Sequence, residues 1–292
     1  MGEKDDALYT YKGNKGYMPL LGFLYEGGMC INDDFRDGNV SPAFGHRDFY
    51  IKCKDRMPLC KRIGYYRADS ASYQADLIND LEADNVIFGI TADMDKAVKR
   101  LVESIKEQDW IEPINGCGYK VADTVHTMDR TSKAFRLVIK REGRQVGLFE
   151  DDKEEKYFYH AIATNWLAEE KDAHSVLKWH NQRGEAENFN KELKIGFAME
   201  RMPCGQTSAN AVFFRIGVIA YNLFLGFRRL SSPQSWQRHR IGTFRWKLLQ
   251  IAGRIVRHAG NVILKLAVKL KELNLFKGIR KKTYEFCSCS TV

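Results

Sequence analysis

Paired cysteines of the kind that build disulfide frameworks or zinc sites are missing from this sequence. Its seven cysteines are an odd number at scattered positions, and none forms a CxxC motif. Reduced thiols in a cytoplasmic protein are the expected state. Cys287-Ser288-Cys289 is the one cysteine pair whose spacing could bind a metal. Without a neighbouring histidine it is weak evidence for a metal site. The cysteine pattern therefore argues against a disulfide-stabilised secreted scaffold.

An apolar leader is also missing. The first residues, MGEKDDALYTYKG, contain no hydrophobic run, so nothing indicates secretion, and Asp6 spoils the serine or threonine position of a myristoylation motif. Residues 209–227 imitate a membrane span, but Arg215 and Asn222 interrupt them. A central arginine costs about 2.5–3.5 kcal/mol on insertion. We expect a buried helix of a cytoplasmic protein and no membrane contact.

Acidic residues are nearly absent from the C-terminal part of the sequence, where Glu272 is the only one between residues 227 and 282. The formal charge of the whole chain is +9 and its pI is about 9.1. A basic C-terminal region predicts a polyanionic partner, most simply nucleic acid or an acidic membrane surface. Its cations stand among aromatic residues: Arg228, Arg229, Arg238, Arg240, Arg245, Lys247, Arg254 and Arg257 with Trp236, Phe244 and Trp246.

The chain is long enough, at 292 residues with 44% hydrophobic residues, to bury a sizeable core. Hydrophobic periodicity and turn residues predict a mixed α/β core. Its elements are a β-hairpin over 16–39 around a Glu-Gly-Gly turn, a helix over 41–56 that begins at Ser41 and Pro42, a strand over 61–69, a helix over 70–85 and a strand over 86–90. Asp69 is expected at the rim of this core, at the end of its strand.

A different pattern follows the core. A helix over 95–108 leads into strands predicted at 135–142, 145–150 and 157–166, which is most simply a β-rich insertion. From Asp172 onward helix is expected to dominate to the end of the sequence. The predicted division is a core over 1–95, the insertion over 96–175, helices closing the core over 176–230, and a basic helical region over 231–292.

The segment HNQRGEAENFNKELK (180–194) places four polar residues on one helical stripe. His180, Arg183, Glu187 and Lys194 are separated by 3, 4 and 7 residues. An apolar stripe lies roughly opposite, formed by Ala186, Phe189, Leu193 and Phe197. By periodicity alone the polar stripe is an ordinary solvated face, with an Arg183–Glu187 pair worth about 0.3–0.5 kcal/mol.

Carboxylates give the stripe a second interpretation. Phosphodiester cleavage uses hard oxygen ligands that hold one or two Mg²⁺ ions, about 3.5–4 Å apart in two-metal sites. Asp69 at a strand end and Glu187 on a later helix are the right ligand type, and Arg183 and Lys194 could hold phosphates. A strand carboxylate with a helix carboxylate is the arrangement of ribonuclease H-like nucleases.

The pattern Tyr-x2-Arg-x3-Glu-x6-Lys is the signature of a large group of bacterial insertion-sequence DDE transposases. Residues 180–194 match its Arg, Glu and Lys, with His180 in place of Tyr. Further blocks resemble one branch of the group in order along the chain: YTYKGNKGYMPLLGFL (9–24), FRDGNVSP (35–42), YRADSASYQADLI (66–78) and TFRWKLLQIAGRIVRH (243–258). The sequence therefore resembles this transposase family over nearly its whole length.

This resemblance implies a ribonuclease H-like domain with a β-rich insertion between the last two catalytic acids. Asp69 resembles the second catalytic aspartate and Glu187 the third carboxylate, and both would be metal ligands for Mg²⁺ or Mn²⁺, two ions in an intact site. His180, Arg183 and Lys194 sit where family members contact DNA. The implied reaction is attack of water on a transposon-end phosphodiester, followed by attack of the freed 3′-OH on target DNA, in a homo-oligomer assembled on DNA.

One feature of the family is not matched. Its first catalytic aspartate lies on a first core strand before the Tyr-Lys-Gly block, whereas only MGEKDDAL precedes Tyr9 here. Asp5 and Asp6 lie in a polar run without an apolar strand around them. Loss of that strand would remove a ligand and leave neighbouring strands unpaired. We therefore expect an N-terminally truncated and catalytically impaired transposase.

Three alternatives remain beside this prediction. A non-catalytic DNA-binding remnant would act through the basic C-terminal region and bind with a steep salt dependence. An amphipathic helix over 248–273 would lie on a membrane surface. A stand-alone ribonuclease would prefer an RNA–DNA hybrid to duplex DNA.

Overall fold

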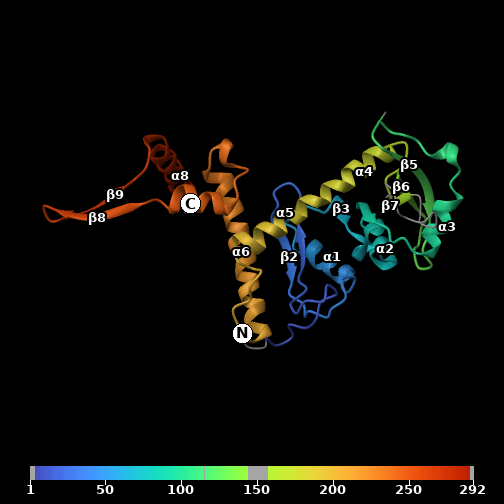
Figure 1. Cartoon of the computed structure of the whole chain (residues 1–292), viewed down its shortest axis with the longest axis horizontal. Helices are drawn as coiled ribbons and strands as arrows, with labels where there is room; N and C mark the ends of the chain where they lie inside the picture. The colour runs from blue at the N-terminus through green and yellow to red at the C-terminus, as the bar shows by residue number, and fades with distance from the viewer. Residues whose placement is uncertain (1–3, 115, 144–156, 290–292) are drawn as a thin grey trace, which may run out of the picture. The chain divides into compact units, whose positions relative to one another are not determined.

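The computed structural model describes residues 4–114, 116–143 and 157–289, apart from a few side chains at the C-terminal end (Figure 1). The chain divides into two compact units, each assembled from separated stretches of sequence. Unit 1 comprises Met1–Ala7, Leu20–Phe35 and Ala186–Val292, and unit 2 comprises Leu8–Pro19 and Arg36–Glu185. The strand predicted at 145–150 and the side chains of Cys287 and Cys289 lie outside what the structure describes.

Unit 2 contains a five-stranded mixed sheet in the order β3-β4-β7-β6-β5. Its strands are β3 (Tyr65–Ala68), β4 (Ile87–Thr91), β5 (Tyr119–His126), β6 (Phe135–Gly143) and β7 (Tyr157–Thr164). Only the β3–β4 pair is parallel. The helices are α1 (His46–Asp55), α2 (Ala75–Ala83), α3 (Lys96–Ser104) and α4 (Ala173–Asn181), with short 3₁₀ helices η1 (Ser70–Ser72), η2 (Glu107–Asp109) and η3 (Gln182–Gly184). This mixed α/β arrangement is compatible with a ribonuclease H-like domain.

The strands of the predicted insertion extend the same sheet. β7 pairs with β6 on one side and with β4 on the other, where Ile90 lies opposite Ala163. β3, which leads to Asp69, is an edge strand, paired only with β4 among the described residues. The predicted division of the chain into four parts stays a prediction.

Hydrophobic side chains cover both faces of this sheet, because alternate residues of a strand point to opposite sides. On β6, Leu137 and Ile139 face the larger core, which also contains α1, α2 and α3. Val138, between them, faces the smaller core formed with Val176 and Leu177 of α4. Each fully buried aliphatic side chain stabilises the fold by about 1.5–3 kcal/mol.

α1 begins later than the sequence predicted. Its first residue is His46, and Gly45 precedes it with φ 78° and no side-chain cap. Ser41 and Pro42 lie in a turn instead, so the prediction of a helix start at Ser41 is wrong. The reason is that the carbonyl of Pro42 is an acceptor for the imidazole Nε2 of His46, 2.7 Å away, which fixes this turn before the helix.

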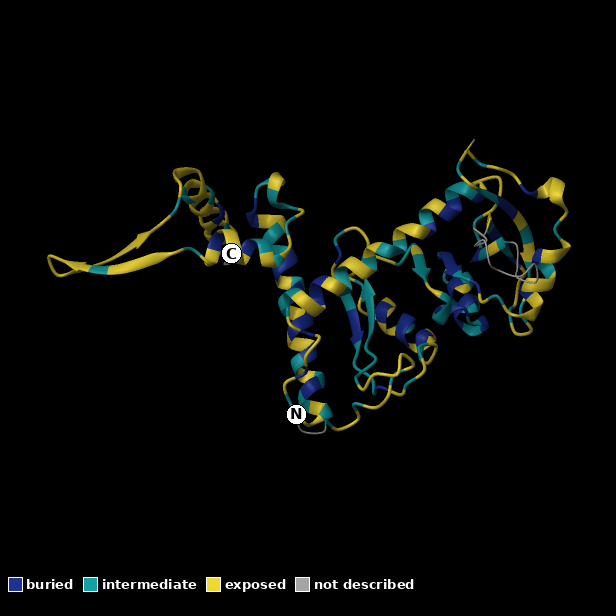
Figure 2. Cartoon of the chain, in the orientation of Figure 1, coloured by how far each residue is buried: buried dark blue, intermediate teal, exposed yellow. Residues whose placement is uncertain are grey.

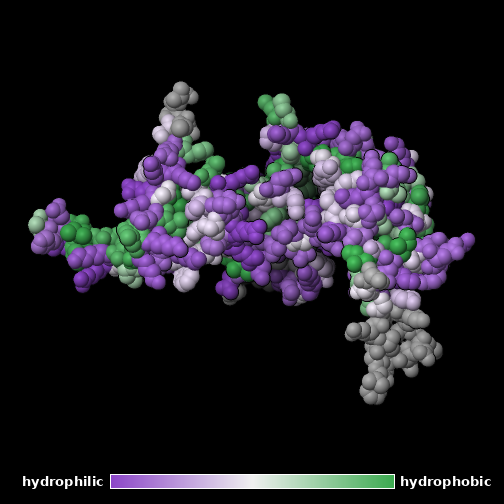
Figure 3. Space-filling model, turned by 90° about the horizontal axis from the view of Figure 1, so that it is seen from above, coloured by the Kyte–Doolittle hydropathy of each residue, from purple (hydrophilic) through white to green (hydrophobic). Residues whose placement is uncertain are grey.

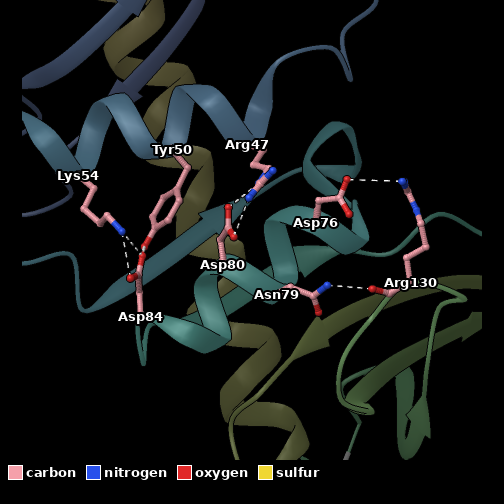
Figure 4. A network of polar contacts seen from close by, with 8 residues as sticks. All are labelled: Arg47, Tyr50, Lys54, Asp76, Asn79, Asp80, Asp84 and Arg130. Carbon is pink, nitrogen blue, oxygen red and sulfur yellow. Dashed lines mark hydrogen bonds and ion pairs between the residues drawn. The ribbon is translucent and has the colours of Figure 1, made fainter.

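α1 is tied to α2 by a row of polar contacts (Figure 4). Arg47 donates to Asp80 at 2.7 Å, and Lys54 and the Tyr50 hydroxyl both donate to Asp84 at 2.8 Å. The Lys54 ammonium and the Tyr50 hydroxyl lower the pKa of Asp84. These contacts are largely exposed, so they add to the orientation of the two helices more than to their stability.

Unit 1 combines a small hairpin with helices. The hairpin strands are β1 (Leu20–Phe23) and β2 (Cys30–Asp34), which are antiparallel as predicted. The remaining elements are α5 (Glu185–Lys191), the π-helical η4 (Glu192–Gly196), α6 (Thr207–Ser231), η5 (Gln234–Trp236), α7 (Ile241–Phe244), the π-helical η6 (Arg245–Leu249), β8 (Gly253–His258), β9 (Asn261–Leu266) and α8 (Leu270–Cys289).

α6 is the segment that imitates a membrane span. By length and composition it could cross a membrane, which for one such helix is weak evidence. Its two polar residues, Asn222 and Arg215, bind β2. The Asn222 side chain accepts from the N–H of Cys30 at 2.9 Å and donates to its carbonyl at 2.8 Å, and Arg215 forms an ion pair with Asp33 at 3.2 Å. The prediction of a buried helix holds for only one face, since 39% of its most apolar 18-residue stretch is buried (Figure 2).

The C-terminal region is not helical throughout, which corrects the prediction for 231–292. β8 and β9 form an antiparallel hairpin within the 248–273 segment that was expected to be one amphipathic helix. The β-branched Ile255, Val256 and Val262 favour strands, and Ala259 and Gly260 turn the chain with φ of 49° and 76°. The membrane-surface alternative depended on that helix and loses its basis.

Candidate active site and nucleic-acid interface

Asp69 stands at the rim of the unit 2 sheet, immediately after β3, as predicted. Its carboxylate is exposed, and one oxygen accepts a hydrogen bond from the backbone N–H of Ala71 at 3.2 Å. Asp69 thereby caps the 3₁₀ turn Ser70–Ser72. The remaining lone pairs of the carboxylate face solvent, where they can serve as ligands.

A buried polar network fixes the turn that follows Asp69. The Ser72 hydroxyl lies 2.6 Å from His46 Nδ1 and 3.1 Å from the Tyr66 hydroxyl. Burial lowers the pKa of His46 and raises the pKa of Tyr66 to about 12, so both are neutral at pH 7. Because His46 Nε2 must donate to the Pro42 carbonyl, its Nδ1 accepts from Ser72, which accepts from Tyr66 in turn.

Arg67 ties β3 to the C-terminal end of α4. Its guanidinium donates to the Trp179 carbonyl at 2.7 Å and to Gln182 Oε1 at 3.1 Å, and lies 5.2 Å from the Trp179 ring centre. A cation at a helix C-terminus is favourable because it complements the helix dipole. Sequence reasoning missed this residue. The available signal was its position two residues before Asp69, within Arg-Ala-Asp.

His180 is fully buried, so the prediction that it shares an exposed stripe with Arg183 and Glu187 is wrong. Its Nδ1 donates to the Gly89 carbonyl and its Nε2 accepts from the Thr91 hydroxyl, both at 3.0 Å. Burial lowers its pKa to about 4, so the imidazole is neutral. α4 packs this side of the helix against the sheet, and a buried side chain makes no DNA contact. His180 is a structural residue here.

Arg183 lies in the 3₁₀ turn after α4 and is half-buried. Its positive charge adds to burial in lowering the pKa values of His160 and His180. The turn also interrupts the regular 100° spacing on which the stripe prediction rested. Arg183 therefore belongs to a positive region beside the end of α4.

Glu187 is exposed on α5, within unit 1. The apolar stripe predicted on its helix is confirmed, since Leu193 is buried and Phe189 is half-buried. Phe189 packs over the hairpin turn: a Cβ on Gly28 would lie 2.8 Å from its ring. Gly28 also has φ +69°, so only glycine suits this position. Lys194 is exposed in the π-helical turn that follows.

Carboxylates of the right type are thus present in both units. Asp69 belongs to unit 2 and Glu187 to unit 1. In the described part of the chain no three His, Cys, Asp or Glu residues gather where they could hold a metal ion. Asp6 accepts from the Thr207 hydroxyl at 2.9 Å, and the Asp5 N–H donates to the Gly205 carbonyl, so both lie at the start of α6 and not on a strand.

Cations and aromatic rings pack together after α6 in unit 1. The Trp236 ring lies 5.0 Å from the Phe244 ring and 5.6 Å from the Lys247 ammonium. Gln237 donates to the carbonyls of Arg228, Arg229 and Ser232 and so satisfies the end of α6. A cavity of about 450 Å³ lies beside this end, lined by Tyr25, Glu26, Gly27, Gly28, Phe189, Leu225, Arg228, Arg229, Gln234 and Gln237.

Comparison with protein families gives one match. A family described as "Transposase DDE domain group 1" matches residues 1–283, nearly the whole chain. Comparison with curated proteins finds no match.

Proposed function

This chain belongs to the DDE transposase family of insertion-sequence type, and we propose that it binds transposon DNA but is impaired in cutting it. Two parts of the molecule support the proposal. The exposed carboxylates of Asp69 and Glu187 are of the ligand type that strand cleavage uses, and the basic C-terminal region is suited to DNA phosphates. Assembly of several copies on DNA belongs to the same proposal.

Impaired cutting rests on the placement of the N-terminal acids. Asp5 and Asp6 are the acids nearest the family's first aspartate in order, and both lie at the start of α6. DDE transposases normally use divalent metals, Mg²⁺ or Mn²⁺, held by several carboxylates. Among the described residues no group of three His, Cys, Asp or Glu residues could hold a metal ion. We therefore assign no step through a metal to this chain.

DNA contacts near the scissile phosphate are proposed for Arg183 and Lys194. Arg183 lies in η3 and Lys194 in η4, on either side of α5, and Lys194 is exposed. Arginine binds phosphate through two parallel hydrogen bonds, whereas lysine acts as a point charge. His180 is left out because its side chain is buried.

A strand-cleavage assay on matched element ends, with Mg²⁺ or Mn²⁺, tests the proposal. Three variants accompany the wild-type chain: Asp69→Ala, Glu187→Ala and the exposed control Asp55→Ala. We expect duplex DNA to be bound by all four and cut by none above background. Robust cleavage that is lost in Asp69→Ala and Glu187→Ala but kept in Asp55→Ala would overturn the impairment. Absence of DNA binding in the wild type would overturn the proposed function itself.

A further inference from the structure

The hairpin of β8 and β9 stands apart from the other elements of unit 1, and we call it the arm (residues 253–266). Six residue pairs join its strands, from Gly253 opposite Leu266 to His258 opposite Asn261. These two strands form a sheet of their own among the described residues. In the chain the arm lies between η6 and α8. Figure 1 shows β8 and β9 extending away from α8, and Figure 2 shows most of the arm exposed.

An isolated ribbon of this kind needs a partner. Two-stranded hairpins are marginally stable in water, because independent stability takes a third strand or a packed face. The arm nevertheless exposes large apolar side chains: Ile255 at 70%, Val262 at 68%, Leu264 at 60% and Leu266 at 45%. Directly opposed residues share a face, so Ile255, Leu264, Val262 and Leu266 form one largely apolar face, which also carries Arg257 opposite Val262. Contiguous exposed apolar surface of this kind marks an interaction site.

The positive charge of the arm favours an anionic partner. Arg254 lies directly opposite Lys265, and like charges in this position destabilise a hairpin. Arg257 and His258 follow toward the turn, and no acidic residue lies between residues 253 and 266. Figure 3 shows hydrophobic residues along the arm, in green at the left of the view, with hydrophilic residues beside them. An anionic partner relieves the repulsion between Arg254 and Lys265, whereas a second copy of the arm adds to it.

We propose that the arm is a DNA-binding ribbon that lies in a groove of the duplex. The major groove, about 12 Å wide, admits a two-stranded β-ribbon. Arg254, Arg257 and Lys265 neutralise phosphates, while the apolar face contacts sugars and thymine methyl groups inside the groove. This inference rests on the proposed function, because it names the surface through which the chain binds its DNA.

Two triple variants of the full chain, with equal loss of charge, test the arm. The arm variant carries Arg254→Gln, Arg257→Gln and Lys265→Gln, and the control carries Arg280→Gln, Lys281→Gln and Lys282→Gln on exposed positions of α8. Duplex binding is measured by fluorescence anisotropy at several salt concentrations. Loss of about three phosphate contacts makes the slope of log K against log salt less negative by about 2.7. We expect this change, with at least tenfold weaker binding, in the arm variant but not in the control.

A second variant tests the apolar face without changing charge. Ile255→Thr keeps a β-branched side chain and Leu264→Thr introduces one, so both changes suit a strand while removing apolar surface. We expect weaker DNA binding with an unchanged salt slope. Unchanged DNA binding together with dissociation of a DNA-free dimer in light scattering would give this face to a second copy and overturn the proposal.

The possible failures are distinguishable. If the wild type binds duplex DNA and the arm and α8 triple variants bind it equally well, the arm is not the DNA surface, but the proposed function stands. If the arm triple variant loses binding to anionic vesicles while duplex binding stays as in the wild type, the partner is a lipid surface and the proposal is overturned. If the wild type binds no duplex DNA, the proposed function and the arm proposal fail together.

Discussion

His180→Gln is the substitution whose consequences the structure specifies most fully. The imidazole is fully buried and is held as the neutral form between the Gly89 carbonyl and the Thr91 hydroxyl. A glutamine amide can donate to one of these groups and accept from the other, but with altered geometry. At pH 7 we expect the variant to lose about 1–2 kcal/mol of unfolding free energy through the weakened hydrogen bonds.

The pH dependence gives this prediction its distinctive sign. In the unfolded chain His180 titrates near 6.5, whereas in the fold burial lowers its pKa to about 4. Between these pH values the unfolded state binds a proton at His180 and the folded state does not. The contribution of His180 to the unfolding free energy is therefore complete above pH 6.5 and falls as the pH drops toward 4. The full difference corresponds to about 3 kcal/mol, of which about 2 kcal/mol is lost by pH 5.

Urea unfolding at pH 7 and pH 5, followed by tryptophan fluorescence, measures the effect. Trp166 and Trp179, whose rings lie 5.1 Å apart, are in the same unit as His180 and report on it. The wild type is more stable than His180→Gln at pH 7, and its loss of about 2 kcal/mol by pH 5 closes or reverses that difference. His258→Gln, on the exposed arm, is the control. Its unfolding free energy should change between pH 7 and pH 5 by as much as that of the wild type. An equal gap between wild type and His180→Gln at both pH values would refute the reasoning.

Two further substitutions probe the packing around the candidate site residues. Gly89→Ala places a Cβ 2.5 Å from the Trp179 ring, so we expect a loss of about 1–3 kcal/mol in urea unfolding; unchanged stability would contradict this tight contact. The N–H of Ile241 donates to the Glu192 carboxylate at 2.9 Å, and Glu192→Ala removes this acceptor. We expect unit 1 to lose about 1–3 kcal/mol of unfolding free energy, measured by Trp236 fluorescence. The exposed control Glu200→Ala should lose none.

The elements between residues 20 and 91 were predictable because their signals are local. In α2, Leu77, Ile78 and Leu81 repeat at helical spacing, and all three are buried in the larger core. The short apolar run at 86–90 became β4, and the Glu-Gly-Gly turn separated β1 from β2. The roles of Asp69 and Glu187 as metal ligands were predicted from chemistry and family resemblance and stay a prediction; both residues are exposed.

His180 could not be placed from the sequence because its environment is tertiary. Spacing assigns a residue to a helix stripe, but the partner surface decides which stripe is buried. A neutral imidazole carries one donor and one acceptor, so it can be buried where both find partners. Gly89 and Thr91, about ninety residues earlier, supply those partners from β4. No pattern within 180–194 carries that information.

The arm was misread for a different reason. Its apolar residues satisfy a helical spacing as well as a strand alternation, and its turn is Ala259-Gly260 where Asn-Gly or Asp-Gly would have been the strong hairpin signal. The β-branched Ile255, Val256, Val262 and Ile263 were the available indication. When a short segment fits both periods, its tertiary context decides whether it forms a helix or a strand. Here β8 and β9 pair with each other, and both faces of the hairpin are exposed.

The two candidate metal ligands are fixed in position by different means, and this bears on how the chain could lose activity. Ser72, with its buried hydrogen bonds, holds the turn after Asp69, while the packing of Phe189 on Gly28 holds the helix of Glu187. Neither arrangement involves a metal or the other acid. Both carboxylates therefore keep their local geometry whether or not a third ligand is present.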